Sequence, residues 1–335
     1  MKVGIYLPSF AYDPSATDHA KRLRRWITTA EEFGFDSLWV TDHLLRASAM
    51  YATSWLEPLA TLAYAAAVTQ QVRLGTGVLL LPYRQPVLLA KELATIQHLS
   101  AGRLILGVGT GWSPAEMRAM GTTVAVRGKR TDEVLEATRA LLSGQSVDFH
   151  GSFFQFDGVT IDPRAEAIPI WVGGGSQVAH SASVERPVLA AAVARRIANS
   201  DGWFIRPTAA PEQILADWDT LQPYIAAAGR RPEDLTIAHG QWLHLTTEAD
   251  PQRAREIQYR YVRSVASDQR PPSLLEEYYL FGTLDEVLEG CARRAAAGVE
   301  HLIIHPYTDE LEQLDLWGRE LLPSLRAMQP TRPLR

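Results

Sequence analysis

Short apolar segments with the pattern of β-strands alternate with helical segments along the whole chain of 335 residues. This alternation constrains the fold more than any other feature, because it is typical of a parallel sheet whose strands are joined by crossover helices. The candidate strands are residues 3–8, 36–40, 72–78, 103–108, 168–173, 201–205, 235–245 and 301–305. Several are almost continuously apolar, as expected of strands covered on both faces. Eight strands with a helix after each predict an α/β fold, a single (β/α)8 TIM barrel over residues 1–335, with an open doubly wound sheet as the alternative.

Helix boundaries can be placed at the last crossover. Thr283 and Glu286 match a capping box, in which each side chain satisfies a backbone N–H at the start of the helix. Gly298 lies where a left-handed residue favours the end of that helix. The sequence therefore predicts a well-delimited helix before the last strand.

Two segments interrupt the alternation. Residues 144–167 carry aromatic and turn residues without a helical period, which predicts a small β excursion or a lid. Residues 176–188 form a polar extension before the next helix. Long connections inside compact domains are more often functional than idle, so we interpret both as insertions at the functional face.

Composition excludes several classes of function. A net charge of -5 gives no broad basic field, so we expect no nucleic-acid partner. The chain has no run of eighteen or more apolar residues, which argues against a membrane span. Its first residues lack the pattern of a secretory signal. The single cysteine, Cys291, cannot form an internal disulfide and is interpreted as a small buried apolar residue. We therefore expect a cytoplasmic protein.

The segment RLILGVGTGW (103–112) runs a strand into alternate glycines. A dinucleotide fingerprint needs glycine at the position of Trp112, and Ser113-Pro114 does not indicate a clean helix start there, so we reject a Rossmann site. Gly107, Gly109 and Gly111 instead leave the strand end without side chains.

Two explanations of these glycines remain open. Small residues can fill a tapering barrel interior, or a flat ring can lie against the bare backbone. A second glycine-lined strand end, with Gly75 and Gly77, favours the ring.

Asp42 and His43 end the second candidate strand. Conserved chemistry in a TIM barrel lies at the carboxyl ends of its strands, and histidine titrates near neutrality. We therefore predict His43 as a general acid/base. A metal site is disfavoured, because His301 and His305, four apart on one strand, would lie about 13 Å from each other.

At this point the chain resembles the bacterial luciferase-like superfamily, whose barrels bind FMN or the deazaflavin coenzyme F420. The resemblance is carried, in order, by residues 34–44 (GFDSLWVTDHL), 57–112, 168–176 (IPIWVGGGS), 200–207 (SDGWFIRP) and 282–290 (GTLDEVLEG). Within the superfamily the middle stretch is most similar to F420-type oxidoreductases of actinobacteria.

The resemblance implies roles for particular residues. It makes His43 the active-site histidine, with Asp42 orienting it or touching the cofactor ring. The ring would lie against Thr76, Gly77, Val78, Gly109, Thr110 and Gly111, with a cis peptide at Gly77–Val78. The phosphate would lie in a nest of backbone N–H groups, for which Arg206 could supply a charge; the nest residues are Gly173, Gly174, Gly175 and Ser176. On the substrate side we place Tyr51, Trp55, Glu57 and Trp112, with helix capping as an equally good account of Glu57.

Two departures from the family bear on the reaction. Desulfonating FMN enzymes of the family have asparagine where Gly107 stands, which argues against FMN. F420-dependent sugar-phosphate dehydrogenases have glutamate where Trp112 stands, which argues against a sugar phosphate.

The sequence therefore predicts hydride transfer between coenzyme F420 and a small organic substrate. An FMN-dependent monooxygenase using O2 is the main alternative, and a flavin-binding protein without turnover and a metal-dependent lyase are further ones. The resemblance also implies a homodimer, formed through helices beside the second and third strands, and allows a separate reductase that supplies reduced cofactor.

Overall fold

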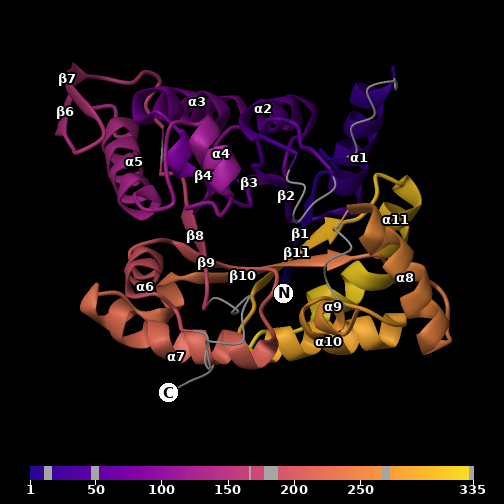
Figure 1. The fold of residues 1–335 in the computed structure, drawn as a ribbon. Helices are drawn as coiled ribbons and strands as arrows, with labels where there is room; N and C mark the ends of the chain where they lie inside the picture. Colours follow the sequence, from indigo (N-terminus) through magenta and orange to yellow (C-terminus); the bar gives the residue numbers. More distant parts are fainter. Residues whose placement is uncertain (11–16, 47–52, 166, 177–187, 266–271, 332–335) are drawn as a thin grey trace.

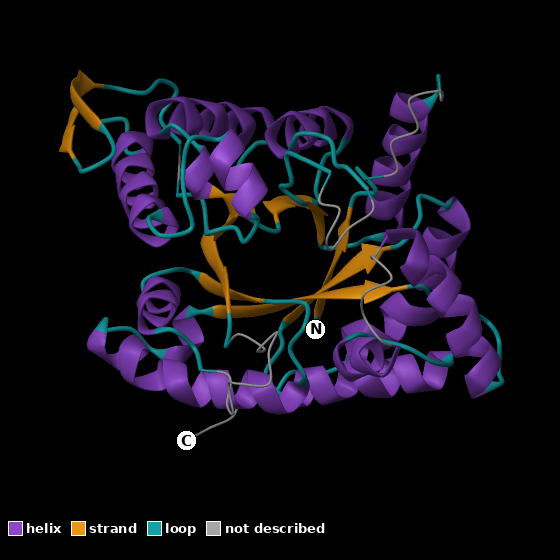
Figure 2. Ribbon diagram, in the orientation of Figure 1, coloured by secondary structure: helices purple, strands orange, loops and turns teal. Residues whose placement is uncertain are grey.

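The computed structural model describes residues 1–10, 17–46, 53–165, 167–176, 188–265 and 272–331. The main sheet is parallel throughout, and it closes on itself because β3 pairs with both β2 and β5. Figure 2 shows this sheet at the centre of the molecule, surrounded by helices. The protein is a (β/α)8 TIM barrel, so the predicted fold class is confirmed and the open sheet is excluded.

The bounds of the elements follow the predicted alternation (Figure 1). The strands of the barrel are β1 (Lys2–Tyr6), β2 (Ser37–Val40), β3 (Arg73–Thr76), β4 (Leu79–Leu80), β5 (Leu104–Gly109), β8 (Ile170–Gly174), β9 (Gly202–Ile205), β10 (Thr236–Leu243) and β11 (His301–Pro306). The α-helices are α1 (His19–Phe33), α2 (Pro58–Val68), α3 (Pro86–Leu99), α4 (Pro114–Ala119), α5 (Arg127–Leu142), α6 (Ala191–Ala198), α7 (Pro211–Ala227), α8 (Pro251–Val265), α9 (Pro272–Tyr278), α10 (Leu284–Ala296), α11 (Leu311–Leu316) and α12 (Leu322–Ala327).

The third predicted strand, 72–78, differs from the structure. It ends at Thr76, and a short strand, β4, resumes at Leu79 after a cis peptide bond between Gly77 and Val78. The cis bond lies where the family resemblance placed it. Both pieces pair with β5, so the interruption leaves the barrel closed.

The predicted capping box is confirmed at α10. The Thr283 hydroxyl accepts the N–H of Glu286, and the Glu286 carboxylate accepts the N–H of Thr283. Gly298, just beyond the helix, has a φ of 94°. Cys291 is buried in this helix, and burial raises the pKa of its thiol to about 12, so it is the inert apolar residue that the sequence predicts.

The predicted β excursion is an antiparallel hairpin, β6 (Val147–His150) and β7 (Gln155–Val159), which stands away from the barrel beside α5 in Figure 1. It connects the end of α5 to the start of β8, whereas the functional face is built by the connections that follow the strands, so its predicted attachment at the functional face is wrong. Glu133 of α5 anchors it by accepting three backbone N–H groups, those of residues 152–154. The predicted polar extension, 176–188, lies almost entirely outside the described residues.

Candidate active site

The predicted site residues converge at the carboxyl ends of the barrel strands. Parallel strands end at the same mouth of a barrel, so residues distant in the sequence become neighbours there. His43 follows β2, the Gly77–Val78 turn follows β3, and Trp112 follows β5. Tyr51 lies outside the described residues.

His43 lies next to two aromatic rings and a carboxylate. Its ring centroid is 5.0 Å from that of Trp55 and 5.6 Å from that of Trp112. Its Nδ1 is 3.4 Å from Oε1 of Glu116. The structure thus brings together three of the predicted site residues and adds Glu116, which sequence reasoning missed.

Glu116 belongs to α4, whose start was misread in the sequence. The helix begins cleanly at Pro114, because proline is well suited to the first helical position and the Ser113 hydroxyl accepts the N–H of Glu116. The spacing of Ser113 and Glu116 is that of a capping box and could have indicated the helix. The Glu116 carboxylate, however, accepts the N–H groups of Leu44 and Leu45, at 2.9 and 3.1 Å, and this tertiary contact has no local signal.

Asp42 organises the turn between β3 and β4. Its Oδ2 accepts the N–H of Leu80 and a guanidinium N–H of Arg84, each at 2.8 Å, while its Oδ1 is buried and has no hydrogen-bond partner in the described structure. Burial raises the pKa of Asp42, and Arg84 and Leu80 only partly oppose this. The hydrogen bonds of Asp42 therefore fix the β3–β4 turn and leave one acceptor unused.

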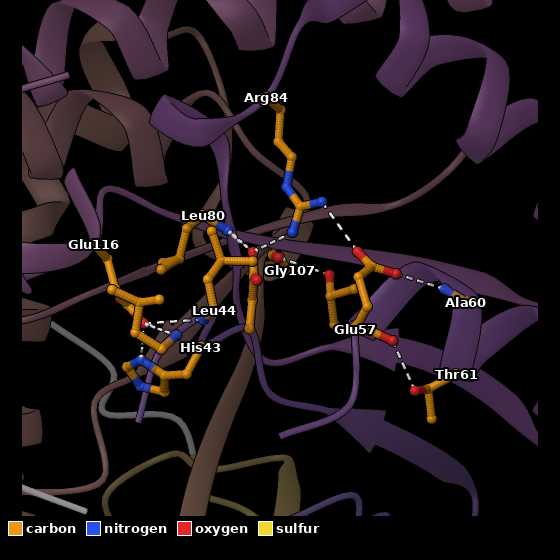
Figure 3. A network of polar contacts seen from close by, with 12 residues as sticks. His43, Leu44, Glu57, Ala60, Thr61, Leu80, Arg84, Gly107 and Glu116 are labelled. Atoms are coloured by element: carbon orange, nitrogen blue, oxygen red, sulfur yellow. Dashed lines mark hydrogen bonds and ion pairs between the residues drawn. The ribbon is translucent and has the colours of Figure 1, made fainter. Parts of the chain in front are cut away.

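Glu57 is a helix cap. It precedes Pro58 at the start of α2, and its Oε2 accepts the N–H of Ala60 at 2.7 Å. Its Oε1 forms an ion pair with Arg84 at 3.0 Å (Figure 3). The capping explanation left open above is thus observed, and the substrate-side role of Glu57 stays a prediction.

The glycines of the strand ends accommodate bulky neighbours. A Cβ on Gly75 would lie 2.4 Å from Trp39, and one on Gly77 would lie 2.3 Å from the Tyr6 hydroxyl. A Cβ on Gly109 would lie 2.5 Å from Val78. The first explanation considered for the glycines, close packing inside the barrel, therefore accounts for these three.

Four of the residues predicted to lie against the cofactor ring remain accessible to a ligand. Gly77, Val78, Thr110 and Gly111 are all partly exposed. Thr76 is buried, and its hydroxyl donates to the carbonyl of Gly107 at 2.7 Å. The side chain of Val78, and not glycine backbone alone, is therefore part of the surface that the ring would contact.

We predict that Gly107→Ala lowers the free energy of unfolding by about 3 kcal/mol, the upper part of the usual cost of overpacking. The new Cβ would lie 2.0 Å from the backbone carbonyl oxygen of Thr76, which cannot move without displacing β3. Gly240→Ala, in β10, is the matched control, because its Cβ would lie 3.6 Å from the nearest atom, an ordinary contact. Urea denaturation of both variants checks the prediction, and equal losses would contradict it.

The predicted phosphate site contains groups of both signs. The N–H of Ser176 donates to Oδ2 of Asp217 at 2.8 Å. Arg206 donates to Thr208 and Gln213, which are neutral, and its buried Nε has no partner among the described residues. Burial lowers the pKa of Arg206 and Asp217 opposes this. Gly174 faces Val193 of α6, where a Cβ would lie 2.4 Å away, so its first role is helix packing.

Further aromatic residues line the mouth beyond those singled out in the sequence. Trp55 belongs to a buried cluster with Phe10, Trp242 and Tyr307. The ring of His305 stacks on Trp242 at 3.4 Å and on Tyr6 at 4.2 Å. Sequence reasoning missed Trp242 and Tyr307, because isolated aromatic residues on separate strands carry no signal of their meeting.

The described residues contain no group of three or more His, Cys, Asp or Glu side chains placed to hold a metal ion. In the same part of the chain, no helix has the length and apolar character needed to span a bilayer.

Comparisons with known proteins extend over nearly the whole chain. The model of the luciferase-like monooxygenase family matches residues 1–301. An F420-dependent glucose-6-phosphate dehydrogenase from Nakamurella multipartita is 29% identical, covering 95% of this chain and 97% of the relative. The solved structure of the monooxygenase RslO1 from Streptomyces bottropensis is 26% identical and superposes with a TM-score of 0.78, covering 96% of this chain and 99% of its own. An F420-dependent secondary alcohol dehydrogenase, solved with an F420–acetone adduct, shares the fold with a TM-score of 0.80 at 20% identity, covering 97% of this chain and 99% of its own.

Proposed function

The chain belongs to the luciferase-like monooxygenase family, and on that premise we propose that it transfers hydride between coenzyme F420 and a small organic substrate, with His43 as general acid/base. The near-full-length similarity to an F420-dependent dehydrogenase carries the choice of cofactor. Trp112, which stands where the sugar-phosphate dehydrogenases have glutamate, is partly exposed beside His43 and favours an uncharged substrate with a C=C or C=O group.

The residues present fit a deazaflavin. The unpartnered Oδ1 of Asp42 is a buried acceptor, as the N–H edge of such a ring requires. Gly77, Val78, Thr110 and Gly111 would hold the ring, and Arg206, which forms no ion pair among the described residues, would attract the phosphate. Asp217 already takes the N–H of Ser176, so that N–H is not part of the proposed phosphate site.

In the proposed reaction, bound F420 supplies or accepts the hydride at its ring. His43 gives a proton to the substrate in the reductive direction and removes one in the oxidative direction. Trp55 and Trp112 lie next to the His43 ring and so limit the access of water to it.

An FMN-dependent monooxygenase is the second candidate, favoured by the similarity to the monooxygenase RslO1. The two candidates differ in which cofactor binds. We expect oxidised F420 to bind at least about tenfold more tightly than FMN, a difference of about 1.4 kcal/mol. Parallel titrations of the purified protein, followed by tryptophan fluorescence, test this, and tighter binding of FMN would reverse the ranking.

We also propose that the protein acts in the cytoplasm as a homodimer and receives reduced cofactor from a separate reductase. Leu88 and Leu99 support the dimer, since they are 59% and 60% exposed. They lie about three turns apart on one face of α3. This helix is on the side of the barrel where the family resemblance places the dimer interface.

The double variant Leu88→Glu, Leu99→Glu is expected to be monomeric, because two charges would be buried in the interface. Light scattering coupled to size-exclusion chromatography measures the mass. Leu215→Glu, on an exposed position of α7, is the control and should leave the mass unchanged. A dimer that persists in the double variant would place the interface elsewhere.

A further inference from the structure

We propose that Glu116 is the positioning residue of His43. Its carboxylate keeps the proton of the neutral imidazole on Nδ1 and thereby makes Nε2 the nitrogen that exchanges a proton with the substrate. The catalytic part of this inference rests on the proposed function, whereas the assignment of the proton stands on the geometry of the unliganded protein.

The geometry places one carboxylate oxygen among three nitrogen atoms (Figure 3). Oε1 of Glu116 is 2.9 Å from the N–H nitrogen of Leu44, 3.1 Å from that of Leu45 and 3.4 Å from Nδ1 of His43. Only 1% of Glu116 is exposed, so water does not compete for this oxygen. The same contact thus holds both the backbone after His43 and the imidazole itself.

The protonation of Glu116 determines the direction of the third hydrogen bond. Burial raises the pKa of Glu116, but the hydrogen bonds from His43, Leu45 and Leu44 lower it by more, so the pKa lies below its usual range. The carboxylate is therefore ionised near neutral pH and can only accept. Nδ1 must then donate, which leaves the lone pair of a neutral imidazole on Nε2.

The surroundings strengthen this arrangement. Burial and the charge of Glu116 raise the pKa of Tyr83, so this neighbour is a neutral phenol. Trp55 and Trp112 flank the imidazole. In such an apolar environment a hydrogen bond to a charged acceptor is worth about twice a neutral one. A free neutral imidazole side chain prefers its proton on Nε2, so a proton on Nδ1 reports the influence of Glu116.

The direct test is a measurement of the tautomer in the protein without cofactor. Long-range ¹H–¹⁵N spectra of histidine-labelled protein at about pH 8.5, where ordinary imidazoles are neutral, distinguish the two ring nitrogens. His43→Asn assigns the signals. We expect Nδ1 to carry the proton in the wild type, and a proton on Nε2 would overturn the inference.

Two variants distinguish an effect of the Glu116 charge on the His43 tautomer from a general loss of structural order. Glu116→Gln keeps an acceptor of the same shape without the charge, so we expect a mixture of tautomers or a shift to Nε2–H. Glu133→Gln is the matched control, because Glu133 also accepts three backbone N–H groups but does so at the hairpin. An unchanged tautomer in Glu116→Gln, or an equal change in Glu133→Gln, would contradict a specific role.

Kinetics then test the catalytic part. With F420 and a panel of enones and ketones, Glu116→Gln should lower kcat about 10²-fold, the low end of a general acid–base contribution, and change KM little. Wild-type protein that turns over none of these would count against the proposed function, whereas the tautomer result would stand by itself. Normal kcat in an active Glu116→Gln enzyme would overturn the positioning role.

Discussion

Replacing His43 by alanine should lower turnover by about 10²- to 10⁴-fold, the usual contribution of a general acid–base group. His43 follows β2 at the barrel mouth and lies next to Glu116, Trp55 and Trp112. The loss should appear in kcat and kcat/KM alike, because proton exchange belongs to the transition state. Stopped-flow measurement of F420 absorbance with an enone or ketone substrate checks it.

The affinity for F420 shows whether a loss of turnover in His43→Ala comes from lost proton transfer or from a damaged cofactor site. We expect the dissociation constant of F420 to change by less than about threefold in His43→Ala, since His43 is proposed to act in the transition state and not in the binding of the cofactor. His98→Ala, an exposed position on the outer helix α3, is the control and should keep full turnover. Near-normal turnover in His43→Ala with F420 bound would remove His43 from the mechanism.

The second large effect is a loss of stability in acid. Four histidines on β10 and β11 or next to them are buried, and burial lowers their pKa values. The pKa is lowered to about 3 for His301 and His305, to about 4 for His244 and well below the usual range for His239. Each folded-state pKa lies below that of an unfolded histidine, so the unfolded chain binds the additional protons as the pH falls.

Stability is therefore fully present above about pH 6.5 and is lost as the pH falls toward the folded-state values. Between pH 7 and pH 5, His301, His305 and His244 should each cost about 2 kcal/mol, about 6 kcal/mol together, and His239 adds to this loss. This is comparable to the total stability of a typical domain, and we expect the protein to unfold near pH 5. Urea denaturation at several pH values measures the dependence.

A variant identifies the groups responsible. His301→Asn should reduce the pH dependence between pH 7 and pH 5 by about 2 kcal/mol, because one buried site no longer titrates. The comparison concerns the pH dependence, since loss of the hydrogen bond between His301 and Ser37 lowers stability at every pH. His98→Asn, on the surface of α3, should keep the wild-type dependence. A protein equally stable at pH 5 and pH 7 would show that these histidines are protonated in the folded state.

Much of the fold was predictable because its signals are local. Each strand is a short apolar run, and the capping residues Thr283 and Glu286 stand at fixed spacing. The strand pattern at 72–78 did not predict that the strand ends at Thr76, and only the family resemblance, which implied the cis peptide at Gly77–Val78, indicated an irregularity there. The hairpin at 147–159 was anticipated as a β excursion, whereas its anchor, Glu133, lies in another element.

The sequence by itself determined the class of fold, the family resemblance and the position of His43 at the end of β2. These follow from the periodicity of the strands and helices and from their order in the sequence, which are local properties of the chain. Only the tertiary structure decided that Glu116 lies against His43 and that Val78 packs over Gly109. It also decided that the four histidines on or next to β10 and β11 are buried. The physical reason is closure of the barrel, which brings strand ends distant in sequence to one mouth, where burial and hydrogen bonding depend on neighbours that no local pattern specifies.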